Sequence, residues 1–89
     1  MFPLGRVVFT AHATARLEQR CAEFGLDSCE ARKRVLETVD QGSISRTCKS
    51  RNKRIYYQYY DDNLSFFVVC NEGYGYVRVV TVIIKTGRE

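Results

Sequence analysis

The sequence predicts an α+β domain in which an amino-terminal helical hairpin packs on one face of a curved, four- to five-stranded antiparallel sheet. In the first half of the chain, apolar residues recur every three to four positions, which is the period of a helix buried along one side. In the second half, runs rich in Val, Ile, Phe and Tyr are separated by short polar turns, as in neighbouring antiparallel strands. With 89 residues, of which 45% are hydrophobic, residues 1–89 have room for a single domain.

The first helix is expected at residues 11–24, directly after a short β-prone segment at residues 6–9. Thr10 can cap its amino terminus, and Gly25 can end it. Its buried stripe consists of Ala13, Leu17, Cys21 and Phe24.

A second helix is expected to start at Asp27 or Ser28, to run to about Asp40 and to end at Gly42. Its apolar face consists of Ala31, Val35, Leu36 and Val39. The residues expected to face solvent are Glu30, Lys33, Arg34 and Glu37. Because only about three residues separate the two helices, they should form an antiparallel hairpin.

Four segments of the second half are candidate strands. They are a weak one at residues 43–47 and stronger ones at 54–60, 64–71 and 76–85. The polar residues at 61–63 and 72–75 are predicted turns. Short turns join successive strands as hairpins, so these strands should form an antiparallel meander.

The cysteines and the hydropathy of the sequence indicate in which compartment the protein is expected. The four cysteines form no C-x-x-C pair and match no zinc spacing, so they are expected to be reduced thiols in a cytoplasmic protein without a metal or other cofactor. No apolar run is long enough to cross a bilayer, and no secretory signal opens the sequence. The net charge of +4 fits an anionic partner.

His12, Arg16 and Arg20 form one candidate functional set. Steps of four residues place them in a line along one edge of the first helix, beside its buried stripe. An imidazole and two guanidiniums in such a line can meet a phosphate or a carboxylate. The alternative is an ordinary solvated border of an amphipathic helix, with Glu18 and Glu23 nearby.

A basic segment followed by tyrosines forms a second set. Its cations are Arg46, Lys49, Arg51, Lys53 and Arg54, and its tyrosines are Tyr56, Tyr57, Tyr59 and Tyr60. Proteins commonly hold single-stranded nucleic acid with cations along the backbone and aromatic rings under the bases. Strand alternation places Tyr57 and Tyr59 on one face and Tyr56 and Tyr60 on the other. The alternative is that the tyrosines are simply good strand residues.

Thr81 is a lone hydroxyl in an apolar strand, where a hydrogen-bonded core threonine is the usual interpretation. By strict alternation, Arg78 and Thr81 point to opposite faces, so both can line one site only if a β-bulge intervenes.

Residues 9–20, Phe-Thr-Ala-His-Ala-Thr-Ala-Arg-Leu-Glu-Gln-Arg, resemble the opening T-x-H-A-x-x-R-h-x-x-R of a family of small bacterial and phage proteins known as a domain of unknown function. Less specific likenesses are residues 29–39, residues 53–60 and the h-h-T-h run at residues 79–82. In the family, the helix breaks soon after the second arginine, whereas residues 21–24 lengthen it here. The family is similar to the barnase–EndoU–colicin–RelE-like (BECR) group of nuclease toxins.

That resemblance implies two helices followed by an antiparallel sheet, with RNA bound against the sheet. It also implies that His12, Arg20 and Thr81 serve the active site and that Arg16 makes a neighbouring anion contact.

The function expected on this basis is RNA binding and metal-independent cleavage by a toxin-type endoribonuclease, in which a ribose 2′-hydroxyl attacks the adjacent phosphate. His12, the single histidine, would act as the general base or the general acid. Tyr56, Tyr57, Lys53 or a water would take the other of these two roles. The cations expected to hold the substrate and its charge are Arg16, Arg20, Lys49, Arg51, Lys53 and Arg54. Expected partners are an RNA such as tRNA or mRNA, and an antitoxin or immunity protein.

Two other functions fit the same residues. One is a non-catalytic, phage-type inhibitor or binding module that docks on a host protein or nucleic-acid complex through its basic face. The other is a small structural subunit, which would expose a large Tyr/Phe face and self-associate.

Overall fold

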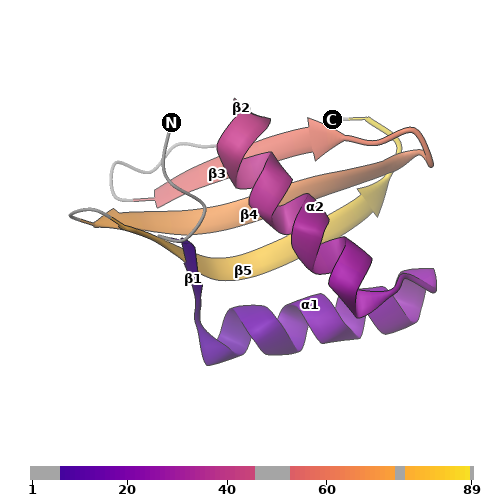
Figure 1. Cartoon of the computed structure of the whole chain (residues 1–89). Helices are drawn as coiled ribbons and strands as arrows, with labels where there is room; N and C mark the ends of the chain where they lie inside the picture. Colours follow the sequence, from indigo (N-terminus) through magenta and orange to yellow (C-terminus); the bar gives the residue numbers. More distant parts are fainter. Residues whose placement is uncertain (1–6, 46–52, 74–75, 89) are drawn as a thin grey trace.

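The computed structural model of the chain describes residues 7–45, 53–73 and 76–88 (Figure 1). Two helices lie on one face of a five-stranded sheet whose strand order is β1-β5-β4-β3-β2. This confirms the predicted α+β architecture. The elements in chain order are β1 (Val7–Phe9), α1 (Ala11–Phe24), α2 (Ser28–Gln41), β2 (Ser43–Ile44), β3 (Lys53–Tyr59), β4 (Leu64–Gly73) and β5 (Tyr76–Thr86).

The sheet is mixed, so the prediction of a purely antiparallel sheet was wrong at one edge. Strands β2 to β5 pair antiparallel, but β1 pairs parallel with β5, with Val7 opposite Val77. No hairpin joins these two strands, because the chain leaves β1 for the helices and enters β5 from β4. Turn chemistry therefore carries no information about the direction of this pair.

Local signals define both helices. The Thr10 side chain accepts a hydrogen bond from the Ala13 amide at 3.0 Å and caps α1, which ends at Gly25 in the left-handed conformation (φ 65°). Asp27 caps α2 in the same way through the Glu30 amide. At the end of α2, a Cβ on Gly42 would lie 2.7 Å from the Tyr57 carbonyl oxygen, so the helix meets the sheet too closely for any other residue.

The face of α2 toward the sheet differs from the predicted one at three positions. Thr38 is fully buried, and its hydroxyl donates to the Arg34 carbonyl at 2.7 Å, whereas Leu36 is only half-buried. Arg34, expected in solvent, lies with its guanidinium 4.8 Å from the Tyr60 ring centroid, and its Nη1 is 2.8 Å from Asp62 Oδ2. The periodicity of the sequence did not predict the positions of Thr38 and Arg34, because a threonine or an arginine can lie at the edge of the core when its polar groups have hydrogen-bond or ion-pair partners.

The strands extend beyond the predicted bounds. β4 continues through Gly73, so residues 72–73 are strand and not turn, and β5 reaches Thr86. Of the weak candidate at residues 43–47, Ser43 and Ile44 form β2, and residues 46–47 lie outside the described residues.

The core lies between the helices and the sheet. Its fully buried members include Ala13 of α1, Val35 of α2, Phe66 of β4 and Val82 of β5. Of the described cysteines, Cys21 and Cys70 are buried and Cys29 is exposed. Burial raises the pKa of the Cys21 thiol, and the charges of Asp27 and Glu18 add to this, so the thiol remains protonated as a small core residue.

Among the described residues, neither helix is long and apolar enough to span a membrane.

A candidate nucleic-acid interface on the open face of the sheet

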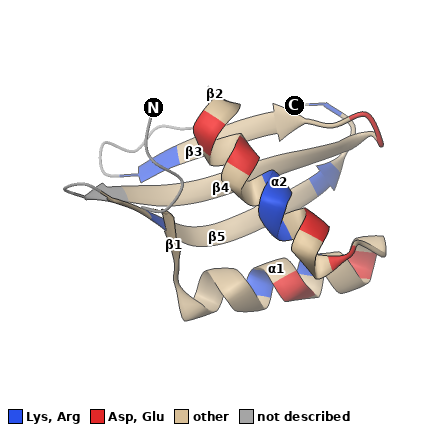
Figure 2. Ribbon diagram, in the orientation of Figure 1, with Lys and Arg blue, Asp and Glu red and all other residues tan. Residues whose placement is uncertain are grey.

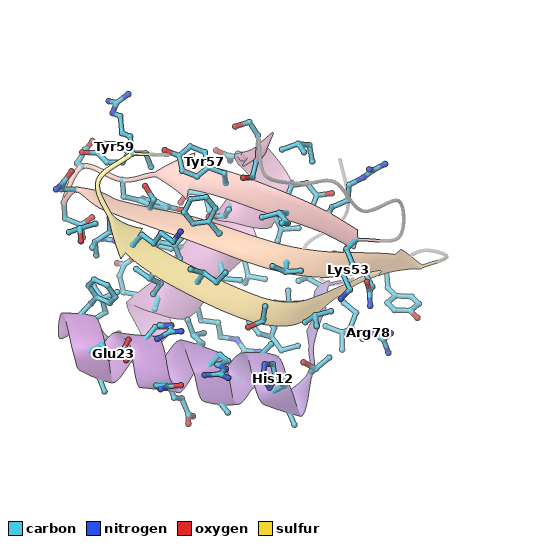
Figure 3. The ribbon with its side chains drawn as sticks, turned by 180° about the vertical axis from the view of Figure 1, so that it is seen from behind. His12, Glu23, Lys53, Tyr57, Tyr59 and Arg78 are labelled. Atoms are coloured by element: carbon cyan, nitrogen blue, oxygen red, sulfur yellow. The ribbon has the colours of Figure 1, made fainter. Side chains whose placement is uncertain are left out.

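One face of the sheet is covered by α1 and α2, and the opposite face, here called the open face, is not (Figures 1 and 3). The residues that alternate with the core side chains of β3, β4 and β5 form it. On β3 they are Lys53, Ile55, Tyr57 and Tyr59; on β4, Ser65, Phe67, Val69 and Asn71; on β5, Arg78, Thr81, Ile83 and Lys85.

A β-bulge in β5 brings Arg78 and Thr81 to the same face. The register shifts between Val69 and Cys70, so that Cys70 pairs with Val79 and Val69 pairs with Thr81. Val80 is thereby left as the extra residue of β5. The alternation restarts after it, which puts Thr81 on the open face with Arg78. The bulge that the sequence required for a shared site is present.

The centre of the open face is apolar and aromatic. Tyr57 and Phe67 are cross-strand partners whose ring centroids lie 5.0 Å apart at an interplanar angle of 43°. Phe67 in turn pairs with Ile83 on β5. These three residues make a row across three strands, flanked by Ile55. Tyr57 and Ile83 are half-buried, and Phe67 between them is 7% exposed.

Cations lie on either side of this apolar row, toward the two ends of the strands. At one end, Lys53 and Arg78 occupy one row through their shared partner Asn71, and Figure 3 shows their side chains at the same end of the strands. At the other end lie Lys85 and, just after β5, Arg88. Arg78 pairs with Asn71 and Lys85 pairs with Ser65, six positions apart along β4, so the two ends are about 20 Å apart at roughly 3.3 Å per residue. By contrast with these cations of the open face, Figure 2 shows acidic residues on the helices and on the turn between β3 and β4.

The start of α1 is tied to the bulge. The Thr10 amide donates to the Val79 carbonyl at 3.1 Å, and its hydroxyl donates to the Val80 carbonyl at 3.4 Å. His12 follows two residues later, is exposed, and lies at the same end of the molecule as Lys53 and Arg78 (Figure 3). The chain therefore places the start of the first helix beside the β5 segment that contains Thr81.

Arg16 and Arg20, the two arginines in line with His12 on α1, each contact a side chain of the same helix. Arg16 donates to the Gln19 side chain at 3.1 Å, and Arg20 Nη1 lies 2.8 Å from Glu23 Oε1. Arg20 Nε is buried without a hydrogen-bond partner. Solvent-exposed ion pairs of this kind contribute only ~0–1 kcal/mol, so an incoming phosphate can displace Glu23 at small cost.

The structure separates the other predicted site residues. Tyr57 lies on β3, two strands from Thr81 on β5, which is about 10 Å at roughly 4.8 Å per strand. Tyr56 belongs to the core under the helices, on the face of β3 opposite Tyr57, so the structure places it apart from the open face. Arg54 lies on the same side of β3 as Tyr56, away from the open face. Lys49 and Arg51 lie outside the described residues.

Sequence reasoning missed Phe67, Lys85 and Arg88. For Phe67 and Lys85 the available signal was the two-residue period of β4 and β5, which sets these side chains apart from the core positions on either side. Arg88 follows β5, and no periodic pattern pointed to it. Their convergence depends on strand register, and no short pattern in the sequence reveals register.

No family model, curated protein or solved structure matches this chain. Within residues 7–45, 53–73 and 76–88, no three His, Cys, Asp or Glu side chains gather as a metal ion would require. The functional argument therefore rests on the chemistry of the open face and of the α1 line.

Proposed function

We propose that this protein binds single-stranded RNA across the open face of its sheet and cleaves it as a metal-independent endoribonuclease of toxin type. One observation carries the proposal: an aromatic and apolar row lies between cations at both ends of the strands, on the sheet face opposite α1 and α2. None of the described open-face residues is acidic. Cations that follow the backbone and rings that stack with bases are the two elements of single-strand recognition.

RNA is favoured over DNA by the reaction that the side chains can support. In metal-free cleavage, the ribose 2′-oxygen attacks the adjacent phosphorus, the 2′-hydroxyl proton goes to a base, and the 5′-oxygen leaves with a proton from an acid. The products are a 2′,3′-cyclic phosphate and a 5′-hydroxyl. DNA lacks the nucleophile, so the same site can bind it without cutting it.

His12 supplies the proton acceptor in this scheme, because an imidazole exchanges protons near neutral pH. Arg20, released from Glu23, and Arg78 stabilise the charge of the pentacoordinate phosphorus. Thr81 donates a hydrogen bond to a phosphate oxygen, and Lys53 protonates the leaving oxygen. Tyr57, about two strands away, contributes base stacking and not proton transfer.

The test is cleavage of a single-stranded RNA oligonucleotide in EDTA, with the all-deoxy strand of the same sequence as substrate control. We expect a 2′,3′-cyclic product from RNA alone, and a loss of about 10²- to 10⁴-fold in rate for His12→Ala, the range typical of a general acid or base. Lys33→Ala, an exposed cation on α2, is the matched control and should cleave normally. Undiminished cleavage by His12→Ala would remove His12 from the mechanism.

A non-catalytic binding module is the second candidate, favoured by the pairing of Arg16 with Gln19 and of Arg20 with Glu23. It predicts RNA binding without cleavage and an unchanged affinity for His12→Ala. Lys53→Gln with Arg78→Gln should still weaken binding, with a smaller salt dependence. A partner that presents acidic side chains, such as an antitoxin or host protein, would compete with RNA for the same cations.

A further inference from the structure

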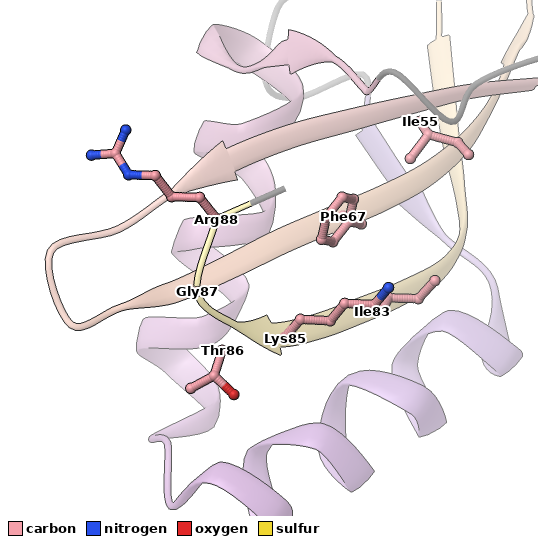
Figure 4. A pocket seen from close by; sticks show the side chains of 7 residues that line it. All are labelled: Ile55, Phe67, Ile83, Lys85, Thr86, Gly87 and Arg88. Atoms are coloured by element: carbon pink, nitrogen blue, oxygen red, sulfur yellow. The ribbon is translucent and has the colours of Figure 1, made fainter.

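A hollow of about 290 Å³ lies at the carboxy-terminal end of the open face (Figure 4). Phe67 stands on β4 at its centre, with Ile55 of β3 on one side and Ile83 of β5 on the other. Its remaining lining residues are Lys85, Thr86, Gly87 and Arg88. The hollow is small for a drug-sized ligand, whose sites usually start at roughly 300 Å³, and suits one compact planar group.

The segment after β5 is held as a wall of this hollow. The Gly87 amide donates to the Asn63 carbonyl at 2.8 Å, and the Gly87 carbonyl accepts from the Ser65 hydroxyl. Gly87 has a φ of 83°, which side-chain-bearing residues rarely adopt. These contacts turn the chain back over the sheet and bring the Arg88 guanidinium to 4.5 Å from the Tyr59 ring centroid.

Among the described residues, the two cations at this hollow have aromatic rings as their partners and no carboxylates. Lys85 Nζ lies 5.4 Å from the Phe67 ring centroid, and Arg88 lies over Tyr59. Neither forms an ion pair with an acidic residue in the described part of the chain, and no lining residue is acidic. An apolar floor with two uncompensated positive charges at its rim complements a ligand that is both flat and anionic.

We propose that this hollow is a nucleotide subsite, in which one nucleobase of the bound RNA stacks on Phe67 and its phosphate lies between Lys85 and Arg88. The inference rests on the proposed RNA binding and specifies where one nucleotide is anchored. This subsite lies about 20 Å along the sheet from the Arg78 end. It therefore positions the strand at a distance from the bond that is cut.

Lys85 covers the Phe67 ring in the free protein, and its displacement is inexpensive. The side chain is exposed, and an exposed cation–π contact is weak compared with the stacking of a base on an aromatic ring. A base can therefore take the place of the ammonium over the ring, while the long Lys85 stem swings the charge to the phosphate. The contact between Lys85 and Phe67 is thereby replaced by two contacts, the base on Phe67 and the phosphate on Lys85.

The experiment follows the amide and aromatic NMR signals of the protein during titration with each of the four nucleoside monophosphates, uridine and inorganic phosphate. We expect at least one monophosphate to shift signals of Phe67, Ile83 and residues 86–88, and to bind roughly tenfold more tightly than uridine or phosphate alone. Phe67→Leu and Arg88→Gln should each weaken that binding by about fivefold or more. Lys33→Gln is the matched control and should leave it unchanged. Shifts that inorganic phosphate alone reproduces would overturn the base-stacking part.

Single-stranded RNA separates this inference from the proposed function. If RNA binding is lost in Lys53→Gln/Arg78→Gln but keeps its full strength in Phe67→Leu and Arg88→Gln, the subsite is refuted and RNA binding stands. If the unaltered protein binds monophosphates at this hollow but binds no RNA, the proposed function fails and the hollow is a site for free nucleotides. Joint weakening of RNA and monophosphate binding by Phe67→Leu supports both.

Discussion

The two faces of the sheet use the same kinds of residue in opposite ways. On the covered face, Arg34 lies over Tyr60 and also pairs with Asp62 at 2.8 Å. On the open face, Arg88 lies over the neighbouring Tyr59 and has no acidic partner among the described residues. A charge that is neutralised by its own chain stabilises the fold, whereas an uncompensated charge is available to a ligand. We therefore expect substitutions on the covered face to change mainly stability, and substitutions on the open face to change mainly the proposed RNA binding.

The adjacent phenylalanines of β4 give the largest expected difference between the faces. Phe66 is fully buried under the helices, with its ring edge-on to Tyr60 at 5.3 Å, so Phe66→Ala leaves an enclosed cavity. We expect it to lower the free energy of unfolding by about 3–5 kcal/mol. Phe67 is 7% exposed but lines the hollow on the open face, so water can enter the space that Phe67→Ala leaves, and this change should cost less than Phe66→Ala. Urea unfolding monitored by circular dichroism measures both values.

RNA affinity should rank these two variants in the reverse order. Folded Phe66→Ala should bind RNA as the parent protein does, whereas Phe67→Ala should bind it several-fold more weakly. Equal losses of stability at the two positions would contradict the division between the faces.

The two arginines provide a second, smaller contrast. Arg34→Met removes an ion pair and a cation–π contact at a side chain that is only 18% exposed, and should cost about 1–2 kcal/mol of unfolding free energy. Arg88→Met should cost less than about 0.5 kcal/mol, as exposed substitutions usually do. Thermal unfolding of both variants beside the parent protein measures the contrast. A loss at Arg88 as large as at Arg34 would make Arg88 a structural residue.

The helices and the separation of the faces were predictable because their signals are local. Helix α1 begins after Thr10 and ends before Gly25, as expected. The two-residue period of β3 places Tyr56 and Tyr57 on opposite faces. The parallel pairing of β1 was not predictable, since residues 7 and 77 meet only after the rest of the chain has folded. Local patterns extend over a few residues, whereas strand order depends on the whole chain.

The candidate site was less predictable than the fold. The sequence showed that Arg78 and Thr81 need a bulge in order to share a face, but it contained no signal that places the extra residue at Val80. It also placed both Tyr56 and Tyr57 in the site, because which face of a strand the helices cover depends on the packing of the whole hairpin. The residue types of a site can be predicted from sequence. Which of those residues lie side by side depends on strand register, which the sequence does not reveal.

The smallest expected effect concerns Tyr60, whose hydroxyl donates to the Arg34 carbonyl at 2.9 Å and lies 3.1 Å from the Thr38 hydroxyl. Burial raises the pKa of this phenol above its ordinary value of 10.0, an effect that the carboxylates of Glu37 and Glu30 increase and that Thr38 and Arg34 oppose. Because the folded pKa is the higher one, the contribution of Tyr60 to stability is complete below pH 10 and is lost as the pH rises through the folded value.

Unfolding free energies measured by urea from pH 8 to pH 11 should therefore fall at the alkaline end, and Tyr60→Phe should flatten part of that decline. Burial of Cys21 lowers stability in the same direction above about pH 9, so the difference between the parent and Tyr60→Phe curves, and not either curve alone, isolates the phenol. Tyr59→Phe leaves Tyr60 in place and should retain the full decline. If Tyr59→Phe flattened the curve and Tyr60→Phe did not, the covered face would not be the one that holds a neutral, hydrogen-bonded phenol.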